Sequence, residues 1–389
     1  MSLQDGPAAL LGGLAPRRFL EHHWQKRPLL VRGAVNGFTG MLSPAELIAL
    51  ACRDEVESRV VIRRAQHWEV QHGPFDPRFF RRLPARGWTL LVQGVNHFLA
   101  SGRELLQRFA FIPYCRLDDL MISYAPAGGG VGPHFDSYDV FLLQGLGRRR
   151  WRISRQRDLT LVPDAPLKLL ANFRPRQEWT LHTGDMLYLP PDWAHDGVAE
   201  NECMTYSIGF RAPAWQELAS QFLAHLQDRL GLPGRYADPD LQPATRPAQL
   251  TPHLLHATVE RFARIRWSRA EVARFLGSHL TEPKPHVFFR PPRRALSLHA
   301  FAQRAVRSGV ELELKTQMLY DGNAVFINGD TLVTGAADPA SRRVRARLRE
   351  LADARWLQPV RDDPAALFAQ LHAWYRTGYL SLRGARRRH

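Results

Sequence analysis

The chain has little lysine, little cysteine and no long apolar run. Four of its 53 basic residues are lysines, and 37 acidic residues leave a net charge of +16. Its three cysteines, Cys52, Cys115 and Cys203, are scattered, which argues against a disulfide framework or a cysteine-rich zinc site. No stretch of about 18 apolar residues occurs, so we expect no membrane partner. These absences predict a globular protein in the reducing cytoplasm.

The excess of positive charge is a weak guide to function. Strongly basic chains often work beside nucleic acid or a ribonucleoprotein. However, almost every basic residue is arginine, a pattern that a coding bias of the genome explains equally well. Nucleic-acid binding therefore stays an open alternative.

Short strand-like runs separated by glycine- and proline-rich turns dominate residues 1–213. One helix precedes them, at Pro16–Trp24. Short strands with closely spaced turn signals predict an antiparallel sandwich or barrel. We therefore expect a mainly β first domain. The runs are Trp88–Gln93, Leu120–Tyr124, Asp139–Leu143, Arg149–Ile153, Asp185–Leu189 and Thr205–Phe210.

Residues 214–282 have a helical pattern instead. Leu218, Phe222 and Leu226 recur at helical spacing. The sequence predicts helices over Trp215–Leu230, His253–Arg266 and Ser268–Leu280, with a proline-rich loop or linker over 233–252. A region of this size is too small to be stable alone, so we expect it to pack against a second copy in a homodimer.

Residues 283–389 mix helices with a small hairpin. The dipeptides Asp321-Gly322 and Asn328-Gly329 are typical of hairpin turns. Together these elements predict an α+β, winged-helix-like C-terminal domain. The expected elements are helices over Ser297–Arg307, Pro339–Ala354 and Pro364–Tyr375, and strands over Val310–Leu314 and Tyr379–Leu382.

The most specific chemistry lies in two short segments of the first domain. His134 and Asp136 are two residues apart, and His195 follows 59 positions after the aspartate. Strand alternation would place the first two on one face, and barrel closure would bring His195 from just beyond another strand. Two imidazoles and one carboxylate leave half of a metal's coordination sphere open, as non-heme Fe(II) oxygenases require. We therefore predict that these three residues are catalytic metal ligands, rather than two surface histidines and a turn aspartate.

A 2-oxoglutarate co-substrate would need a cation for its far carboxylate, and arginine binds carboxylates through two hydrogen bonds. If Trp151 and Ile153 face the core, alternation turns Arg149 inward and its arginine neighbours toward solvent. Tyr138 shares the parity of His134 and Asp136, so we expect it to line the same pocket or to pack in the core.

The sequence around these residues resembles that of the Jumonji C ribosomal oxygenases, and more narrowly of their bacterial type. The resemblance is carried by the triad, by the Gly-Gly-Gly-Val-Gly-Pro run before His134, and by Trp88–His97 and Tyr206–Pro213. It covers residues 15–215. Beyond them it rests on architecture, since the family has a helical dimerisation region and a C-terminal winged helix.

The resemblance implies a cupin-like double-stranded β-helix, or jelly roll, that uses Fe(II), 2-oxoglutarate and O₂. It implies hydroxylation of an arginine β-carbon (C3) in large-subunit ribosomal protein L-sixteen. The family's metal ligands match His134, Asp136 and His195, its 2-oxoglutarate arginine matches Arg149, and Ser123 is a further keto-acid contact. A guanidinium substrate would favour acidic or aromatic neighbours, and the candidates are Asp118, Asp139, Tyr138 and Trp193.

Two other functions stay open from the sequence. The same metal chemistry could demethylate a protein, or hydroxylate a different protein or a small molecule. Alternatively, a non-catalytic winged-helix protein could bind nucleic acid beside a vestigial barrel. The intact triad together with Arg149 argues against the non-catalytic alternative, but the triad does not distinguish hydroxylation from demethylation.

Overall fold

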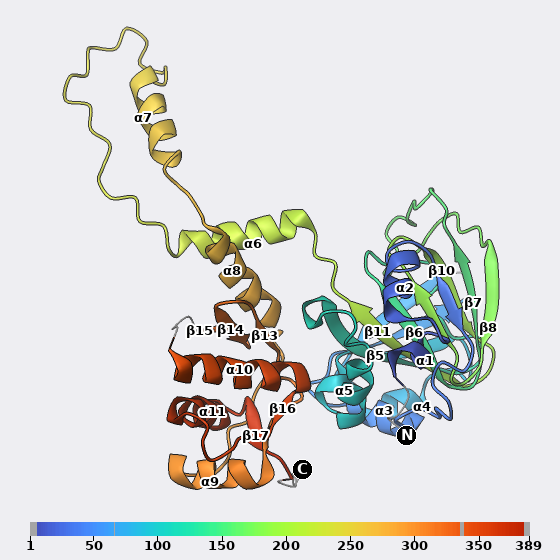
Figure 1. Cartoon of the computed structure of the whole chain (residues 1–389). Helices are drawn as coiled ribbons and strands as arrows, with labels where there is room; N and C mark the ends of the chain where they lie inside the picture. The colour runs from blue at the N-terminus through green and yellow to red at the C-terminus, as the bar shows by residue number, and fades with distance from the viewer. Residues whose placement is uncertain (1–5, 66, 335–337, 385–389) are drawn as a thin grey trace. The chain divides into compact units, whose positions relative to one another are not determined.

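Every paired strand in the described residues is antiparallel, as the sequence predicts. The computed structural model in Figure 1 describes residues 6–65, 67–334 and 338–384. An eight-stranded sheet has the order β1-β9-β6-β11-β5-β4-β2-β3, and a three-stranded sheet has the order β10-β7-β8. The strands of the large sheet are β1 (Leu29–Val31), β9 (Met186–Leu189), β6 (Val140–Leu146), β11 (Cys203–Phe210), β5 (Leu117–Ala125), β4 (Trp88–Val92), β2 (Ser58–Arg64) and β3 (His67–His72). Those of the small sheet are β10 (Ala194–Ala199), β7 (Arg149–Ser154) and β8 (Gln177–Leu181).

Strand alternation gives the large sheet two different faces. On β6, Phe141 and Leu143 belong to the main hydrophobic core, whereas Val140 and Leu142 pack with Trp151 of the small sheet. Because successive side chains of a strand point to opposite faces, one face packs on helices and the other faces the interior between the sheets. The functional pocket is on this second face.

Short helices pack on the first face of the large sheet. Phe19 of α2 and Leu105 of α5 are completely buried in its core. The helix α3 begins with a capping box in which Ser43 and Glu46 exchange hydrogen bonds. The helices are α1 (Pro7–Leu10), α2 (Pro16–His22), α3 (Pro44–Ala51), α4 (Pro77–Arg81) and α5 (Ala100–Gln107), with 3₁₀ turns η1 (Val95–His97) and η2 (Tyr114–Arg116).

The chain forms two compact units that each combine distant segments. The first contains the described residues up to Ala212, Pro283–Gln317 and those from Glu350 onward. In this unit Arg103 of α5 donates to the carbonyl of Leu314 at 2.6 Å, so the segment that contains Leu314 packs against α5. Its C-terminal elements are α9 (Leu298–Ser308), β12 (Val310–Leu312), β16 (Trp356–Leu357), α11 (Ala365–Thr377) and β17 (Leu380–Leu382).

The second unit contains Pro213–Glu282 and Met318–Arg349. Its α8 packs closely on a three-stranded hairpin sheet: a Cβ at Gly277 would lie 2.3 Å from the ring of Phe326, so only glycine fits. The predicted capping box of Ser268 and Glu271 is confirmed. Its elements are α6 (Trp215–Gln227), α7 (Pro252–Phe262), α8 (Arg269–Thr281), β13 (Met318–Tyr320), β14 (Ala324–Ile327) and β15 (Asp330–Val333); α10 (Pro339–Ala354) begins in this unit.

These units combine segments that the predicted domain boundaries at residues 213 and 283 would separate. The division of the chain into the domains 1–213, 214–282 and 283–389 therefore stays a prediction. In the described part of the chain, no helix combines the length and the apolar character needed to cross a membrane.

Candidate metal centre and its pocket

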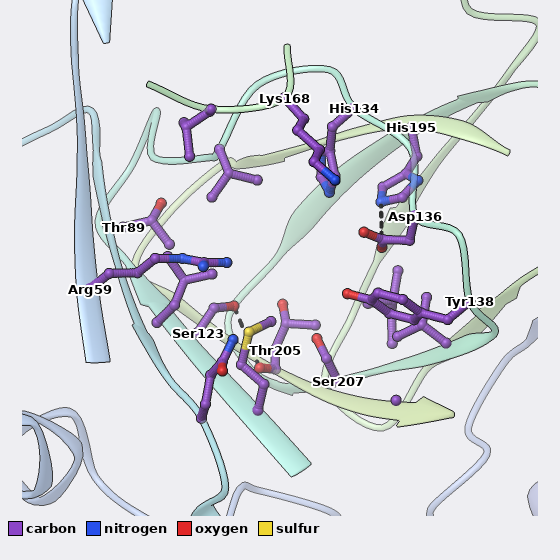
Figure 2. Close-up of a pocket in the computed structure, with 18 of the residues that line it drawn as sticks. Arg59, Thr89, Ser123, His134, Asp136, Tyr138, Lys168, His195, Thr205 and Ser207 are labelled. Carbon is purple, nitrogen blue, oxygen red and sulfur yellow. Dashed lines mark hydrogen bonds and ion pairs between the residues drawn. The ribbon is translucent and has the colours of Figure 1, made fainter. Parts of the chain in front are cut away.

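The three predicted metal ligands meet at one point of the structure. One potential ligand atom from each of His134, Asp136 and His195 lies within 4.8 Å of the other two. The Nε2 atom of His195 is 3.7 Å from a carboxylate oxygen of Asp136, as the dashed line in Figure 2 marks. Two atoms bound to one ion at about 2.0–2.2 Å lie at most about 4.4 Å apart, so the 3.7 Å separation of His195 and Asp136 suits a shared ion. In the described residues, this is the one cluster of three such side chains.

Backbone carbonyls orient both imidazoles for metal binding. The Nδ1 atom of His134 is 2.9 Å from the Gly132 carbonyl oxygen, and that of His195 is 2.8 Å from the Trp193 carbonyl oxygen. A carbonyl can only accept, so each Nδ1 carries the proton and each Nε2 presents its lone pair. Burial, reinforced by the neighbouring His134, lowers the pKa of His195 to about 4. Its ring is therefore neutral at pH 7, as a metal ligand must be.

The backbone that carries the ligands differs from the prediction in one detail. His134 and Asp136 do not lie in a regular strand; His134 forms only an isolated antiparallel bridge with His195. His195 follows the end of β9, as predicted, and is the second residue of the next strand, β10. Two backbone hydrogen bonds between the histidines, at 2.9 and 2.7 Å, hold the segments together. A local bridge therefore achieves the convergence that we expected from strand alternation and barrel closure.

The metal cluster lies in a pocket of about 510 Å³ between the two sheets. Arg149, Ser123 and Tyr138, the predicted keto-acid residues, all line it. The inward orientation of Arg149 is confirmed: its exposed fraction is 4%, whereas Arg150 beside it is exposed. The Nε and Nη2 atoms of Arg149 are buried and have no hydrogen-bond partner among the described residues. A buried guanidinium without an acceptor is suited to an anionic ligand.

Tyr138 and Ser123 contribute hydroxyl groups to this pocket, as Figure 2 shows. Burial and the nearby Asp136 raise the pKa of Tyr138 above its ordinary range, so its hydroxyl keeps the proton. Ser123 lies on β5 opposite Thr205 of β11 and donates to the Thr205 carbonyl oxygen at 3.5 Å. A carboxylate ligand would offer either hydroxyl a charged acceptor in place of its present one, which is the Thr205 carbonyl for Ser123 and Asp136 for Tyr138.

Two adjacent carboxylates also line the pocket. Asp118 is partly exposed and lies 3.4 Å from Arg211 and 3.8 Å from Lys284. Asp119 is more deeply placed and accepts a hydrogen bond from the Gly94 amide at 2.9 Å. Burial and the adjacent Asp118 raise the pKa of Asp119 to about 6. Asp119 is therefore mostly ionised at neutral pH, whereas Arg211 and Lys284 offset the charge of Asp118.

Two of the substrate candidates named from the sequence lie elsewhere. Asp139 is completely buried and accepts hydrogen bonds from Tyr188 at 2.6 Å and Gln25 at 3.0 Å. It is wrong as a substrate residue, because its parity on the chain turns it away from the interior face. Trp193 lines a separate cavity beside the metal pocket.

Several lining residues were not predicted from the sequence. Figure 2 shows Arg59 and Thr89 reaching the pocket, from β2 and β4 of the large sheet, and Lys168 approaching from the loop after β7. Alternation along β2 was a signal for Arg59, since Val60 and Ile62 belong to the core on the opposite face. Without the pairing order of the strands, this signal could not place Arg59 beside the metal site.

Known proteins resemble the chain along almost its whole length. The signature of the JmjC domain matches residues 104–218, and that of the ROXA-like winged helix matches residues 264–381. The ribosomal protein uL16 3-hydroxylase of Escherichia coli is 34% identical over 372 residues, covering 94% of this chain and 97% of that protein. A "Bifunctional lysine-specific demethylase and histidyl-hydroxylase" of Drosophila persimilis is 25% identical over 232 residues, which cover 57% of this chain and 33% of that protein.

The fold is similar to that of a solved ribosomal oxygenase. YcfD from Escherichia coli, in complex with cobalt and 2-oxoglutarate, matches with a TM-score of 0.79 and 33% identity. The match covers 95% of this chain and 99% of YcfD. The cupin-like β-rich fold and the winged helix expected from the sequence are thereby confirmed. The chain belongs to the bacterial ribosomal oxygenases, which combine a JmjC domain with a ROXA-like winged helix.

Proposed function

We propose that this protein is an Fe(II)- and 2-oxoglutarate-dependent oxygenase that hydroxylates C3 of an arginine in ribosomal protein uL16. The convergence of His134, Asp136 and His195 in one pocket carries this proposal. The similarity to a uL16 3-hydroxylase over 94% of the chain supports the choice of substrate. The demethylase relative matches a much smaller share of the chain, so we rank demethylation below hydroxylation.

The three ligands fit a ferrous ion. Two nitrogen donors and one carboxylate, with no thiolate in the group, favour iron over a structural zinc. When bound, the ion supplies the oxidation chemistry, in which O₂ cleaves the keto acid to succinate and CO₂ and oxygenates a C–H bond. The protein keeps the His195 ring neutral and orients both imidazoles through their Nδ1 atoms, so that both Nε2 atoms face the site of the ion.

Arg149 is the proposed partner of the 2-oxoglutarate carboxylate that lies away from the metal. Its buried nitrogens lack acceptors among the described residues, and a carboxylate would supply two. We assign Ser123 and Tyr138 to the same task as hydroxyl donors, because both line the pocket. The cost of burying an unpaired guanidinium favours binding of an anion at this position.

Asp118 and Asp119 are suited to receive the substrate arginine. Two adjacent carboxylates attract a guanidinium and can bind it through charge-assisted hydrogen bonds. The ionised Asp119 would attract a cationic side chain locally, whereas a chain of net charge +16 as a whole repels a basic ribosomal protein. The substrate cation would compete with Lys284 for Asp118.

We also infer that the protein is a homodimer through residues 214–282, one of three proposed domains beside 1–213 and 283–389. The helices α6 and α7 expose large apolar side chains, and α7 has no buried residue. Exposed apolar surface of this kind is typical of protein interfaces. A ribosomal substrate implies a cytoplasmic location. Binding of nucleic acid by the winged helix is compatible with this function and is not required by it.

Mass spectrometry tests the proposed function directly. The purified protein is incubated with Fe(II), ascorbate, 2-oxoglutarate and uL16 from cells that lack this gene. We expect the mass of one oxygen atom to be added to a single arginine-containing peptide, with one succinate formed per modification. Release of formaldehyde with loss of a methyl group would instead identify a demethylase, and no change in any ribosomal protein would contradict the proposal.

A further inference from the structure

The pocket face of the large sheet is organised in rows that run across the strands. On β5, the alternate residues Asp119, Met121 and Ser123 line the pocket. Met121 pairs with Ser207 of β11, and Ser123 pairs with Thr205, which in turn pairs with Gln144 of β6. Since alternate residues of a strand are about 6.6 Å apart, the row of Ser123 lies roughly 13 Å from Asp119.

Arg59 extends the row of Ser123 across two more strands. Ser123 pairs with Leu91 of β4, and Leu91 pairs with Arg59 of β2. Directly paired residues of antiparallel strands point to the same face, so Arg59 shares the pocket face with Ser123. Figure 2 shows its side chain entering the pocket beside Thr89 and Ser123, on the side away from the three metal ligands.

The guanidinium of Arg59 has no partner of its own. No hydrogen bond or ion pair in the described part of the chain involves it, and its buried Nε lacks an acceptor. Arg64 on the same strand differs, because it is exposed and lies 3.9 Å from the carboxylate of Glu69. The buried Nε of the half-buried Arg59 lacks an acceptor, and an anionic ligand in the pocket would provide one.

The acidic end of the pocket, at Asp119, therefore lies opposite the end that holds Arg59 and Arg149. On the small sheet, His195 pairs with Ile153, whereas Ala199 pairs with Arg149, four positions further along β10. Arg149 therefore lies further along the small sheet than the metal ligand His195. In the same way, the row of Arg59 lies further along β5 than Asp119. A basic substrate would be attracted to the acidic end and repelled by two unpaired arginines. A dicarboxylate that reaches from the metal toward the arginines would match this polarity.

We propose that Arg59 is a second arginine that recognises 2-oxoglutarate, acting with Arg149 on the carboxylate remote from the metal. The inference rests on the proposed function and deepens it. Two guanidinium groups from different sheets would clamp one carboxylate from two sides. This arrangement selects keto acids that carry a second carboxylate over monocarboxylic keto acids of similar length.

Binding of 2-oxoglutarate to the Mn(II)-loaded full-length protein, measured by calorimetry without O₂, tests this role. Arg59→Met keeps the aliphatic stem and removes the charge, and we expect it to raise Kd roughly ten- to hundredfold. Arg59→Lys should recover part of the affinity, and the exposed control Arg64→Met should bind as the wild type does. The metal-free Arg59→Met protein should be as stable as the wild type or more stable, because an unpaired charge has been removed.

The outcomes separate this inference from the function on which it rests. Wild-type affinity in Arg59→Met together with weak binding in Arg149→Met would overturn the role of Arg59 and leave the proposed function standing. If Arg59→Met raised only the KM for the protein substrate, Arg59 would belong to substrate binding and the inference would also fail. Failure of the wild-type Mn(II) protein to bind 2-oxoglutarate would contradict the proposed function itself.

Discussion

The sheets of the first unit and the helical segment 213–282 bury their apolar residues to very different extents. Side chains of the sheets, such as Phe141, Tyr188 and Tyr206, are completely buried. In the helical segment only Leu226 and Phe275 are buried large apolar side chains, whereas Trp215 is 86% exposed. The sheets therefore complete their own core, but the helices lack a partner for much of their apolar surface. This difference suggests that catalysis depends on the first unit and assembly on the second.

Removal of a metal ligand is the strongest test of the division between catalysis in the first unit and assembly in the second. His134→Ala or Asp136→Ala should abolish hydroxylation, because two remaining ligands cannot hold the ion with the required affinity and geometry. Hydroxylation is measured by mass spectrometry of uL16, and assembly by light scattering. Both variants should retain the wild-type oligomeric state. Activity close to that of the wild type in either variant would refute the ligand assignment.

Removal of the charge at Arg149 should have the next largest effect. We expect Arg149→Ala to raise the KM for 2-oxoglutarate about ten- to hundredfold, since a charge-assisted, two-pronged carboxylate contact is lost. The exposed neighbour Arg150 provides the matched control, and Arg150→Ala should leave this KM unchanged. An unchanged KM in Arg149→Ala would exclude its carboxylate role.

Acidification should weaken substrate binding through Asp119. Its pKa is raised to about 6, so the folded protein protonates this carboxyl as the pH falls from 7.5 to 5.5, and a cationic substrate loses attraction. Loss of this one charge limits the effect, so we expect about fourfold weaker binding of a uL16 peptide at the lower pH, measured by calorimetry with the Mn(II)-loaded protein.

Asp119→Asn is the control for this pH dependence. Asparagine still accepts the hydrogen bond from the Gly94 amide but carries no charge. Its binding should be weak at both pH values, with a smaller change between them. An equally steep pH dependence in Asp119→Asn would assign the titration to another group.

Polar substitutions on the helical segment should affect turnover least and assembly most. Leu255 and Phe262 of α7 are both exposed by 60% or more, and each would contribute about 1.5–3 kcal/mol if a second copy covered it. The double variant Leu255→Asp/Phe262→Asp should be monomeric by light scattering, while keto-acid turnover changes less than about twofold. A monomeric wild-type protein, or a dimer that survives both substitutions, would contradict the proposed interface.

Local patterns of the sequence predicted much of the catalytic site. From the spacing of His134, Asp136 and His195 we predicted that these side chains meet at one site, and they do. Alternation along β7 correctly predicted that Arg149 points inward. These inferences needed only the parity of one strand or the chemistry of one donor set. The capping box at Ser268 is equally local and is also present.

Features that depend on long-range pairing could not be predicted in this way. Arg59 reaches the pocket only because β2 pairs with β4 and β4 with β5, an order that no local pattern specifies. Asp139 was assigned to the substrate although its parity turns it toward the opposite face, where Tyr188 and Gln25 satisfy it. Likewise, the packing of Arg103 against Leu314 joins segments more than 200 residues apart.

A crystal structure of the protein with Mn(II) and 2-oxoglutarate, grown without O₂, tests the account most directly. We predict one anomalous scattering peak within bonding distance of Nε2 of His134, Nε2 of His195 and a carboxylate oxygen of Asp136, with the far carboxylate of the keto acid at Arg149 and Arg59. A metal bound elsewhere, or either imidazole beyond bonding distance of the ion, would contradict it.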